Sequence, residues 1–149
     1  MNVGVEHRIE FIRELDGVRW YNDSIATSPT RTIAGLNAFD RKIILIAGGY
    51  DKNIPFEPLA SPVLEKVKLL VLVGDTTGKI ELAVTGCEGY SPERLPILRA
   101  GDIPRAAEIC REHAKAGDIV SLSPACASFD SYANFEKRGE HFKKIVNDF

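Results

Sequence analysis

Four short segments of this sequence place glycine, hydroxyl and charged residues directly after runs that favour β-strands. They are residues 22–27, 48–52, 74–77 and 123–130. Such segments can bind anions, because glycine lets the backbone approach a ligand while amides and hydroxyls donate hydrogen bonds to it. Lys52 adds a mobile cation beside a glycine pair, which suits a carboxylate or a phosphate. The pattern therefore predicts a site for a small anionic ligand.

Each segment also has a purely structural interpretation. Asp23 can cap a turn, Thr27 can simply precede a helix cap, and the glycine pair can serve only to turn the chain. The small residues of 123–130 can pack a loop against a sheet. Cys126 among them is expected to be a small buried residue, since no histidine or acid is identifiably paired with it. Residues 74–77 predict a loop and a helix cap, without a function.

Motifs for several other kinds of site are missing from the sequence. The GYDK tetrapeptide at 49–52 is not a GxxxxGK[ST] loop, and no GxGxxG occurs, so a complete dinucleotide site is not expected. Cys87, Cys110 and Cys126 are odd in number and far apart, which favours free thiols over disulfides. The three histidines are scattered, so the sequence predicts no metal site.

The bulk composition fits one globular domain with an ordinary core. The chain has 149 residues, of which 44% are hydrophobic and 27% charged. Its 19 basic and 21 acidic residues are interspersed, so neither nucleic acid nor an anionic membrane is an expected partner. The most apolar runs, at 43–47 and 69–73, are too short to span a bilayer, and no secretory signal is expected.

Strands and helices that alternate along the chain would position the four segments. A hairpin is predicted from strands at 7–14 and 18–22, because both residues of the Asp16-Gly17 turn tolerate positive φ. Further strands are predicted at 42–47, 69–73, 96–99 and 119–122. One helix is expected after the Ser28 cap, two more cover 56–67 and 79–85, and a fourth runs from the Asp102 cap to a stop at Gly117. A fifth helix closes the chain. It carries Phe135, Phe142, Ile145 and Val146 on one side and Glu136, Lys137, Arg138 and Lys143 on the other.

This alternation indicates an α/β fold. We expect a Rossmann-like three-layer domain, with a mostly parallel sheet, an antiparallel N-terminal hairpin strand and helices on both faces. Ligands in such sheets bind outside the carboxyl ends of the strands. The four polar segments should therefore meet along one rim of the domain.

Five segments, in order, resemble the third, C-terminal domain of the Mur ligases, and most of all the branch of that family that adds D-glutamate. They are GVEHR at 4–8, YNDSIAT at 21–27, AGGYDK at 47–52, LSPACASFD at 122–130 and NFEKRG at 134–139, followed by Phe142. The DNPR motif usual in the diaminopimelate-adding branch is absent. The resemblance implies a single Mur ligase C-terminal domain over 1–149, without the N-terminal UDP-binding domain and the central ATPase domain.

The resemblance also implies an activity, that of a cytoplasmic ATP-dependent ligase in peptidoglycan-precursor synthesis. In the family's reaction ATP and Mg²⁺ convert the carboxylate of UDP-N-acetylmuramoyl-L-alanine into an acyl phosphate, which the amine of D-glutamate attacks. The third domain receives D-glutamate and closes over ATP, while the P-loop and the magnesium ligands belong to the central domain. The chain alone is therefore expected to be inactive.

Individual roles follow by the same resemblance. The residues expected around D-glutamate are Thr27, Lys52, Ser128, Phe129 and Phe135. Arg8 and Asp23 should meet ATP, with Asp23 at the ribose hydroxyls and Arg8 near the phosphates. No catalytic residue and no metal ligand is expected in this chain. Ile25 stands where the family usually has lysine, so a charge expected near the phosphates is missing.

Two other interpretations remain open from the sequence. The chain could belong to another ligase of the Mur and folylpolyglutamate synthase superfamily, although segment 123–130 argues against this. It could also be a stand-alone Rossmann-like binding module without catalysis. A preceding domain with a GxxGK[ST] motif in the same gene would favour the ligase, and its absence would favour the binding module.

Overall fold

Six strands and five helices alternate along the part of the chain that the computed structural model describes, residues 5–149. The strands are β1 Glu10–Leu15, β2 Val18–Asn22, β3 Ile43–Ala47, β4 Val67–Val73, β5 Ile97–Gly101 and β6 Ile119–Leu122. The helices are α1 Pro29–Asn37, α2 Glu57–Lys66, α3 Thr77–Thr85, α4 Ile103–His113 and α5 Phe135–Asn147. Gly4, where the resemblance to the Mur ligases begins, lies outside the described residues.

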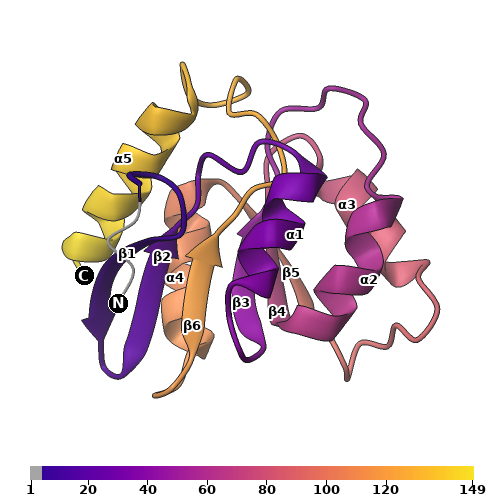
Figure 1. Cartoon of the computed structure of the whole chain (residues 1–149), viewed down its shortest axis with the longest axis horizontal. Coiled ribbons are helices and arrows are strands. Elements are labelled where there is room, and N and C mark those ends of the chain that lie inside the picture. The colour runs from indigo at the N-terminus through magenta and orange to yellow at the C-terminus, as the bar shows by residue number, and fades with distance from the viewer. Residues whose placement is uncertain (1–4) are drawn as a thin grey trace.

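The strands form one sheet in the order β1-β2-β6-β3-β4-β5 (Figure 1). β1 and β2 pair antiparallel, and every other neighbouring pair is parallel. The hairpin turn has Asp16 at φ 53° and Gly17 at φ 80°, the positive values that its sequence predicted. The α/β fold class, with its mostly parallel sheet and N-terminal hairpin, is confirmed.

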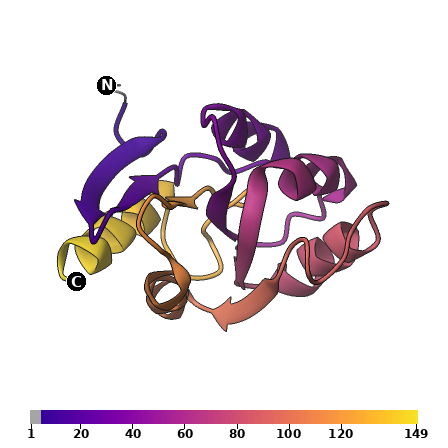
Figure 2. The same ribbon diagram turned by 90° about the horizontal axis from the view of Figure 1, so that it is seen from below.

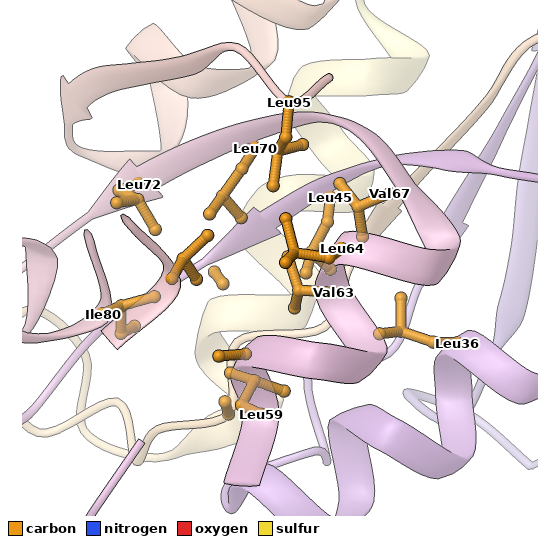
Figure 3. Close-up of a cluster of buried hydrophobic side chains, with 14 of the residues drawn as sticks. Leu36, Leu45, Leu59, Val63, Leu64, Val67, Leu70, Leu72, Ile80 and Leu95 are labelled. Atoms are coloured by element: carbon orange, nitrogen blue, oxygen red, sulfur yellow. The ribbon is translucent and has the colours of Figure 1, made fainter. Parts of the chain in front are cut away.

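Helices cover both faces of this sheet, as can be followed in the view from below in Figure 2. One core lies beneath α1, α2 and α3 and includes Leu36, Leu64 and Ile80 (Figure 3). The other lies beneath α4 and α5 and includes Cys110 and Phe142. Because β3 and β4 are covered on both faces, their side chains alternate between the two cores, which explains their continuous apolar runs.

Some element boundaries differ from those the sequence predicted. The first strand begins at Glu10 rather than at residue 7, because His7 and Ile9 have φ of 67° and 44° and interrupt the extended chain. The helix capped by Asp102 ends at His113, so Gly117 lies in the following turn and does not end it. None of the helices among residues 5–149 has the length and apolar character needed to cross a membrane.

Candidate functional site

The carboxyl ends of β2, β6 and β3 lie side by side, so the loops that follow them meet along one rim (Figure 1). Backbone hydrogen bonds join these loops. The amide of Asp23 donates to the carbonyl of Leu122 at 2.7 Å, and the amide of Tyr50 donates to the carbonyl of Ala127 at 2.9 Å. Three of the four predicted segments therefore form one continuous surface.

The fourth segment, 74–77, supports the glycine loop of this rim. The Thr76 hydroxyl accepts from the amide of Gly49 at 3.0 Å, and the Thr76 amide donates to the Gly49 carbonyl at 3.2 Å. Gly48 has φ 118°, and a Cβ there would overlap the carbonyl oxygen of Val73. The glycine pair is thus needed for close approach to the end of β4.

Arg8 and Asp23, the two residues predicted to meet a nucleotide, line one pocket of about 370 Å³. The complete lining is Arg8, Ile9, Asp23, Ile25, Thr30, Arg31, Ala34 and Gly35. One carboxylate oxygen of Asp23 accepts from the amide of Ile9 at 3.1 Å, and the other accepts from the Ser123 hydroxyl at 2.7 Å. Asp23 therefore lines the pocket and also fixes the local backbone through its bond to Ile9.

Burial raises the pKa of the Asp23 carboxyl, against the opposing effect of its hydrogen bonds and of nearby guanidinium groups. Each carboxylate oxygen has two lone pairs, so both can accept a further hydrogen bond from a ligand hydroxyl. A buried carboxylate with spare acceptor capacity suits the vicinal hydroxyls of a ribose.

The residues predicted to surround D-glutamate are distributed along the rest of the rim. Ser128 is 2% exposed, and its hydroxyl has no hydrogen-bond partner among residues 5–149. Lys52 is exposed, and within the described part of the chain its ammonium forms no ion pair. The Tyr50–Ala127 bridge holds the loops of Lys52 and Ser128 together. This side of the rim thus holds an exposed cation and a buried hydroxyl, neither of which has a partner among residues 5–149.

Two of the predicted residues contribute aromatic rings. Phe129 is 63% exposed and meets Tyr50 edge to face, with 6.0 Å between ring centroids. Phe135 is half-buried and packs in the same way against His7, also at 6.0 Å. Thr27 is half-buried on the loop after β2, and no hydrogen bond of residues 5–149 joins it to Lys52 or to Ser128.

Arg138, which was predicted on the charged side of the closing helix, opposite Phe135 and Phe142, is buried with only 2% exposure. Its Nε donates to the Ser24 hydroxyl at 2.9 Å, and its Nη2 donates to the Ser24 carbonyl at 2.8 Å. The Ser24 hydroxyl in turn donates to the carbonyl of Phe135 at 2.8 Å. Arg138 therefore anchors the loop that carries Asp23 to helix α5.

The sequence held a signal for this burial. Arg138 follows Phe135 by three residues and precedes Phe142 by four, so it lies on the apolar stripe of α5. Its Nη1 has no partner within residues 5–149, and desolvation lowers the pKa of its guanidinium to about 10. The assignment of Arg138 to the side opposite Phe135 and Phe142 was wrong because it followed charge rather than helical position.

Cys126 is buried, as predicted, and is no candidate nucleophile. Its sulfur lies 3.3 Å from the Thr76 hydroxyl, and burial raises the pKa of the thiol to about 11. Cys87, Cys110 and Cys126 are free thiols. Among residues 5–149 no group of three or more His, Cys, Asp or Glu side chains is placed to hold a metal ion.

Comparisons with known proteins identify relatives of this chain. Residues 7–126 match the family described as "Mur ligase, glutamate ligase domain". UDP-N-acetylmuramoylalanine--D-glutamate ligase from Clostridium botulinum (strain Okra / Type B1) is 56% identical over 144 residues, which are 97% of this chain and 31% of the relative. The Clostridium acetobutylicum enzyme of the same name is 57% identical over 145 residues, with the same shares.

A solved structure shows the same fold at low sequence identity. The bifunctional folylpolyglutamate synthase/dihydrofolate synthase from Yersinia pestis CO92, complexed with AMPPNP and Mn ion, superimposes with a TM-score of 0.63 at 13% identity. The match covers 96% of this chain and 32% of that structure. The chain thus spans about a third of the length of the proteins it resembles.

Proposed function

Since this chain belongs to the Mur ligase glutamate ligase domain family, we propose that it serves as the C-terminal domain of an ATP-dependent ligase that adds D-glutamate to UDP-N-acetylmuramoyl-L-alanine. In this proposal the enzyme is cytoplasmic and makes a peptidoglycan precursor. The observation that carries it is the rim, where the exposed Lys52 ammonium and the buried Ser128 hydroxyl have no partner among residues 5–149 and lie on loops joined by a hydrogen bond. The chain is 56% identical to the Clostridium botulinum ligase over 97% of its own length, and this supports D-glutamate as the shared substrate.

The amino-acid side of the rim suits a dicarboxylate. An ionised carboxylate taken from water requires a cation and hydrogen-bond donors, because burying it unpaired is costly. Lys52 would supply the cation, and the hydroxyls of Thr27 and Ser128 would supply donors. Phe129 and Phe135 would form apolar walls against the methylene groups of D-glutamate. Held in this way, the amine can be aimed at the carbonyl carbon of an acyl phosphate, and this positioning is the domain's contribution to the rate.

The nucleotide side suits ATP. In the proposal Asp23 accepts hydrogen bonds from the ribose hydroxyls, and the exposed guanidinium of Arg8 faces the phosphates, where it offsets charge during phosphoryl transfer. Mg²⁺ would help to neutralise the same phosphates. Among residues 5–149 no group of three or more His, Cys, Asp or Glu side chains is placed to hold that ion, and in this proposal its ligands belong to the central domain. UDP-N-acetylmuramoyl-L-alanine would likewise bind to parts of the ligase outside these 149 residues.

Kinetics of the complete ligase that contains this chain test the proposal. We expect Lys52→Ala to raise the KM for D-glutamate at least about tenfold, the factor that corresponds to one lost charged contact. Lys79→Ala is the matched control, because Lys79 is an exposed lysine that pairs with the neighbouring Asp51. It should leave this KM unchanged.

The 149 residues alone should release no phosphate from ATP in the presence of D-glutamate, because the phosphate-binding loop is not among them. Turnover by this chain alone at the rate of a complete enzyme would refute the division of labour. An unchanged KM in the Lys52→Ala enzyme would remove Lys52 from the amino-acid site.

A further inference from the structure

The pocket that contains Asp23 has a second arginine in its lining. Arg31 lies in the first turn of α1, and its amide donates to the side chain of the helix cap Ser28 at 3.4 Å. Arg31 and Arg8 are both exposed and both line the pocket. Among residues 5–149 neither guanidinium has a hydrogen bond or an ion pair. Two cations therefore face one pocket without partners.

The position of Arg31 is fixed by the packing of its helix. Gly35, one turn further along α1, lies so close to Asp23 that an added Cβ would sit 2.5 Å from a carboxylate oxygen of Asp23 and 3.3 Å from the Ser123 hydroxyl. Close contact between α1 and the end of β2 thus sets where Arg31 stands relative to Asp23. Arg31 lies on a helix rather than on a loop.

Charge and size of the pocket point to the same ligand chemistry. Asp23 is its single acidic lining residue, and that carboxylate is already engaged by Ile9 and Ser123, so the lining carries an excess of positive charge. Like charges that face one cavity repel unless an anion binds between them. A volume of about 370 Å³ is at the small end for a ligand site, enough for a nucleoside. The phosphates of a nucleotide would then extend to the mouth, where the exposed arginines lie.

Part of the lining is apolar. Ile9, Ile25 and Ala34 line the pocket together with Asp23, so position 25 contributes no cation. Any positive charge in the pocket other than that of Arg8 comes from Arg31.

We propose that Arg31 is the second phosphate-binding cation of this pocket and determines its preference for triphosphates over less charged nucleotides. This inference rests on the proposed function, because it assumes that a nucleotide occupies the pocket. Arg8, just before β1, and Arg31, in α1, would both contact phosphate oxygens, while Asp23 binds the sugar. Arg31 acts here by binding, and no chemical step is assigned to it.

Titration of the 149-residue chain with ATP, ADP, AMP and adenosine, followed by amide chemical shifts in magnesium-free buffer, tests this. The native chain should show shifts around the pocket at millimolar nucleotide, with affinity that rises with phosphate number. Arg31→Ala should weaken ATP about fivefold to tenfold, the range for a partly exposed charged contact, and should leave adenosine unchanged. Arg31→Lys should retain most of the preference, since an ammonium also binds phosphate.

Arg105→Ala is the matched control. Arg105 occupies the same place in α4 that Arg31 occupies in α1, with its amide bonded to the helix cap Asp102 at 2.9 Å, but it pairs with Glu108 and does not line the pocket. It should bind ATP as the native chain does. Ile25→Lys combined with Arg31→Ala should restore ATP affinity, because residue 25 lines the same pocket.

The outcomes separate this inference from the function on which it rests. If the native chain binds ATP and Arg8→Ala weakens it, but Arg31→Ala does not, Arg31 has no such role and the nucleotide site stands. If no nucleotide shifts any pocket amide of the native chain, both the site and the role of Arg31 are overturned. In the complete ligase, Arg31→Ala should raise the KM for ATP and leave the KM for D-glutamate unchanged.

Discussion

The unpartnered hydroxyl of Ser128 gives a prediction in which stability and function change in opposite directions. A buried polar group without a hydrogen bond costs about 1–3 kcal/mol, and Ser128 is 2% exposed with no partner among residues 5–149. Ser128→Ala removes that cost and leaves a void the size of one oxygen, worth a few tenths of a kcal/mol. The substitution should therefore raise the free energy of unfolding by about 1 kcal/mol.

Urea and thermal unfolding of the 149-residue chain measure this change. A gain of about 1 kcal/mol corresponds to a rise in Tm of about 2–4 °C for a domain of this size. Ser123→Ala is the matched control, because Ser123 is also buried but its hydroxyl donates to Asp23 at 2.7 Å and lies 3.2 Å from Thr32. Ser123→Ala should lower the free energy of unfolding by about 1–3 kcal/mol.

The functional half of the prediction uses the complete ligase. If the hydroxyl of Ser128 is held for D-glutamate, Ser128→Ala should raise the KM for this substrate about fivefold to tenfold and leave the KM for ATP unchanged. A Ser128→Ala chain that is destabilised as strongly as Ser123→Ala would refute the reasoning, because the hydroxyl would then have a structural partner. A stabilised chain with an unchanged KM would refute its role in the amino-acid site.

Two further predictions concern the nucleotide side of the rim. Burial raises the pKa of Asp23, so the ionised carboxylate lowers the stability of the folded chain at pH values above that pKa. Asp23→Asn should therefore have a free energy of unfolding equal to or higher than that of the native chain at neutral pH. The difference should vanish in acid, where the carboxyl is protonated in both the folded and the unfolded chain. The same variant should bind ATP more weakly in the titration, and a marked loss of stability at neutral pH would contradict the assignment. Arg138→Met removes a desolvated cation, which is favourable, but it also removes both hydrogen bonds to Ser24. The free energy of unfolding in urea should therefore fall by only about 1–2 kcal/mol. Amide hydrogen exchange should meanwhile accelerate at residues 22–27, and unchanged protection there would show that Arg138 does not anchor the loop.

Much of the fold could be predicted from local chemistry. The Asp16-Gly17 turn, the Ser28 cap before Pro29 and the Asp102 cap are all observed, because such signals act over a few neighbouring residues. The continuous apolar runs of β3 and β4 likewise predicted strands covered on both faces. The start of β1 could not be predicted, since the left-handed backbone at Ile9 depends on a hydrogen bond to Asp23, 14 residues away.

The sequence by itself determined the fold class, the family and the segments that carry polar residues, because these depend on residue type and spacing along the chain. Only the tertiary structure decided which of those residues share a pocket: Arg8 and Asp23 do, and Arg31 joins them. It also decided that Arg138 is buried and that the Ser128 hydroxyl is left without a partner in the described part of the chain. The physical reason is that burial and hydrogen-bond partners arise from the strand order, which brings β2, β6 and β3 together although they are far apart in sequence.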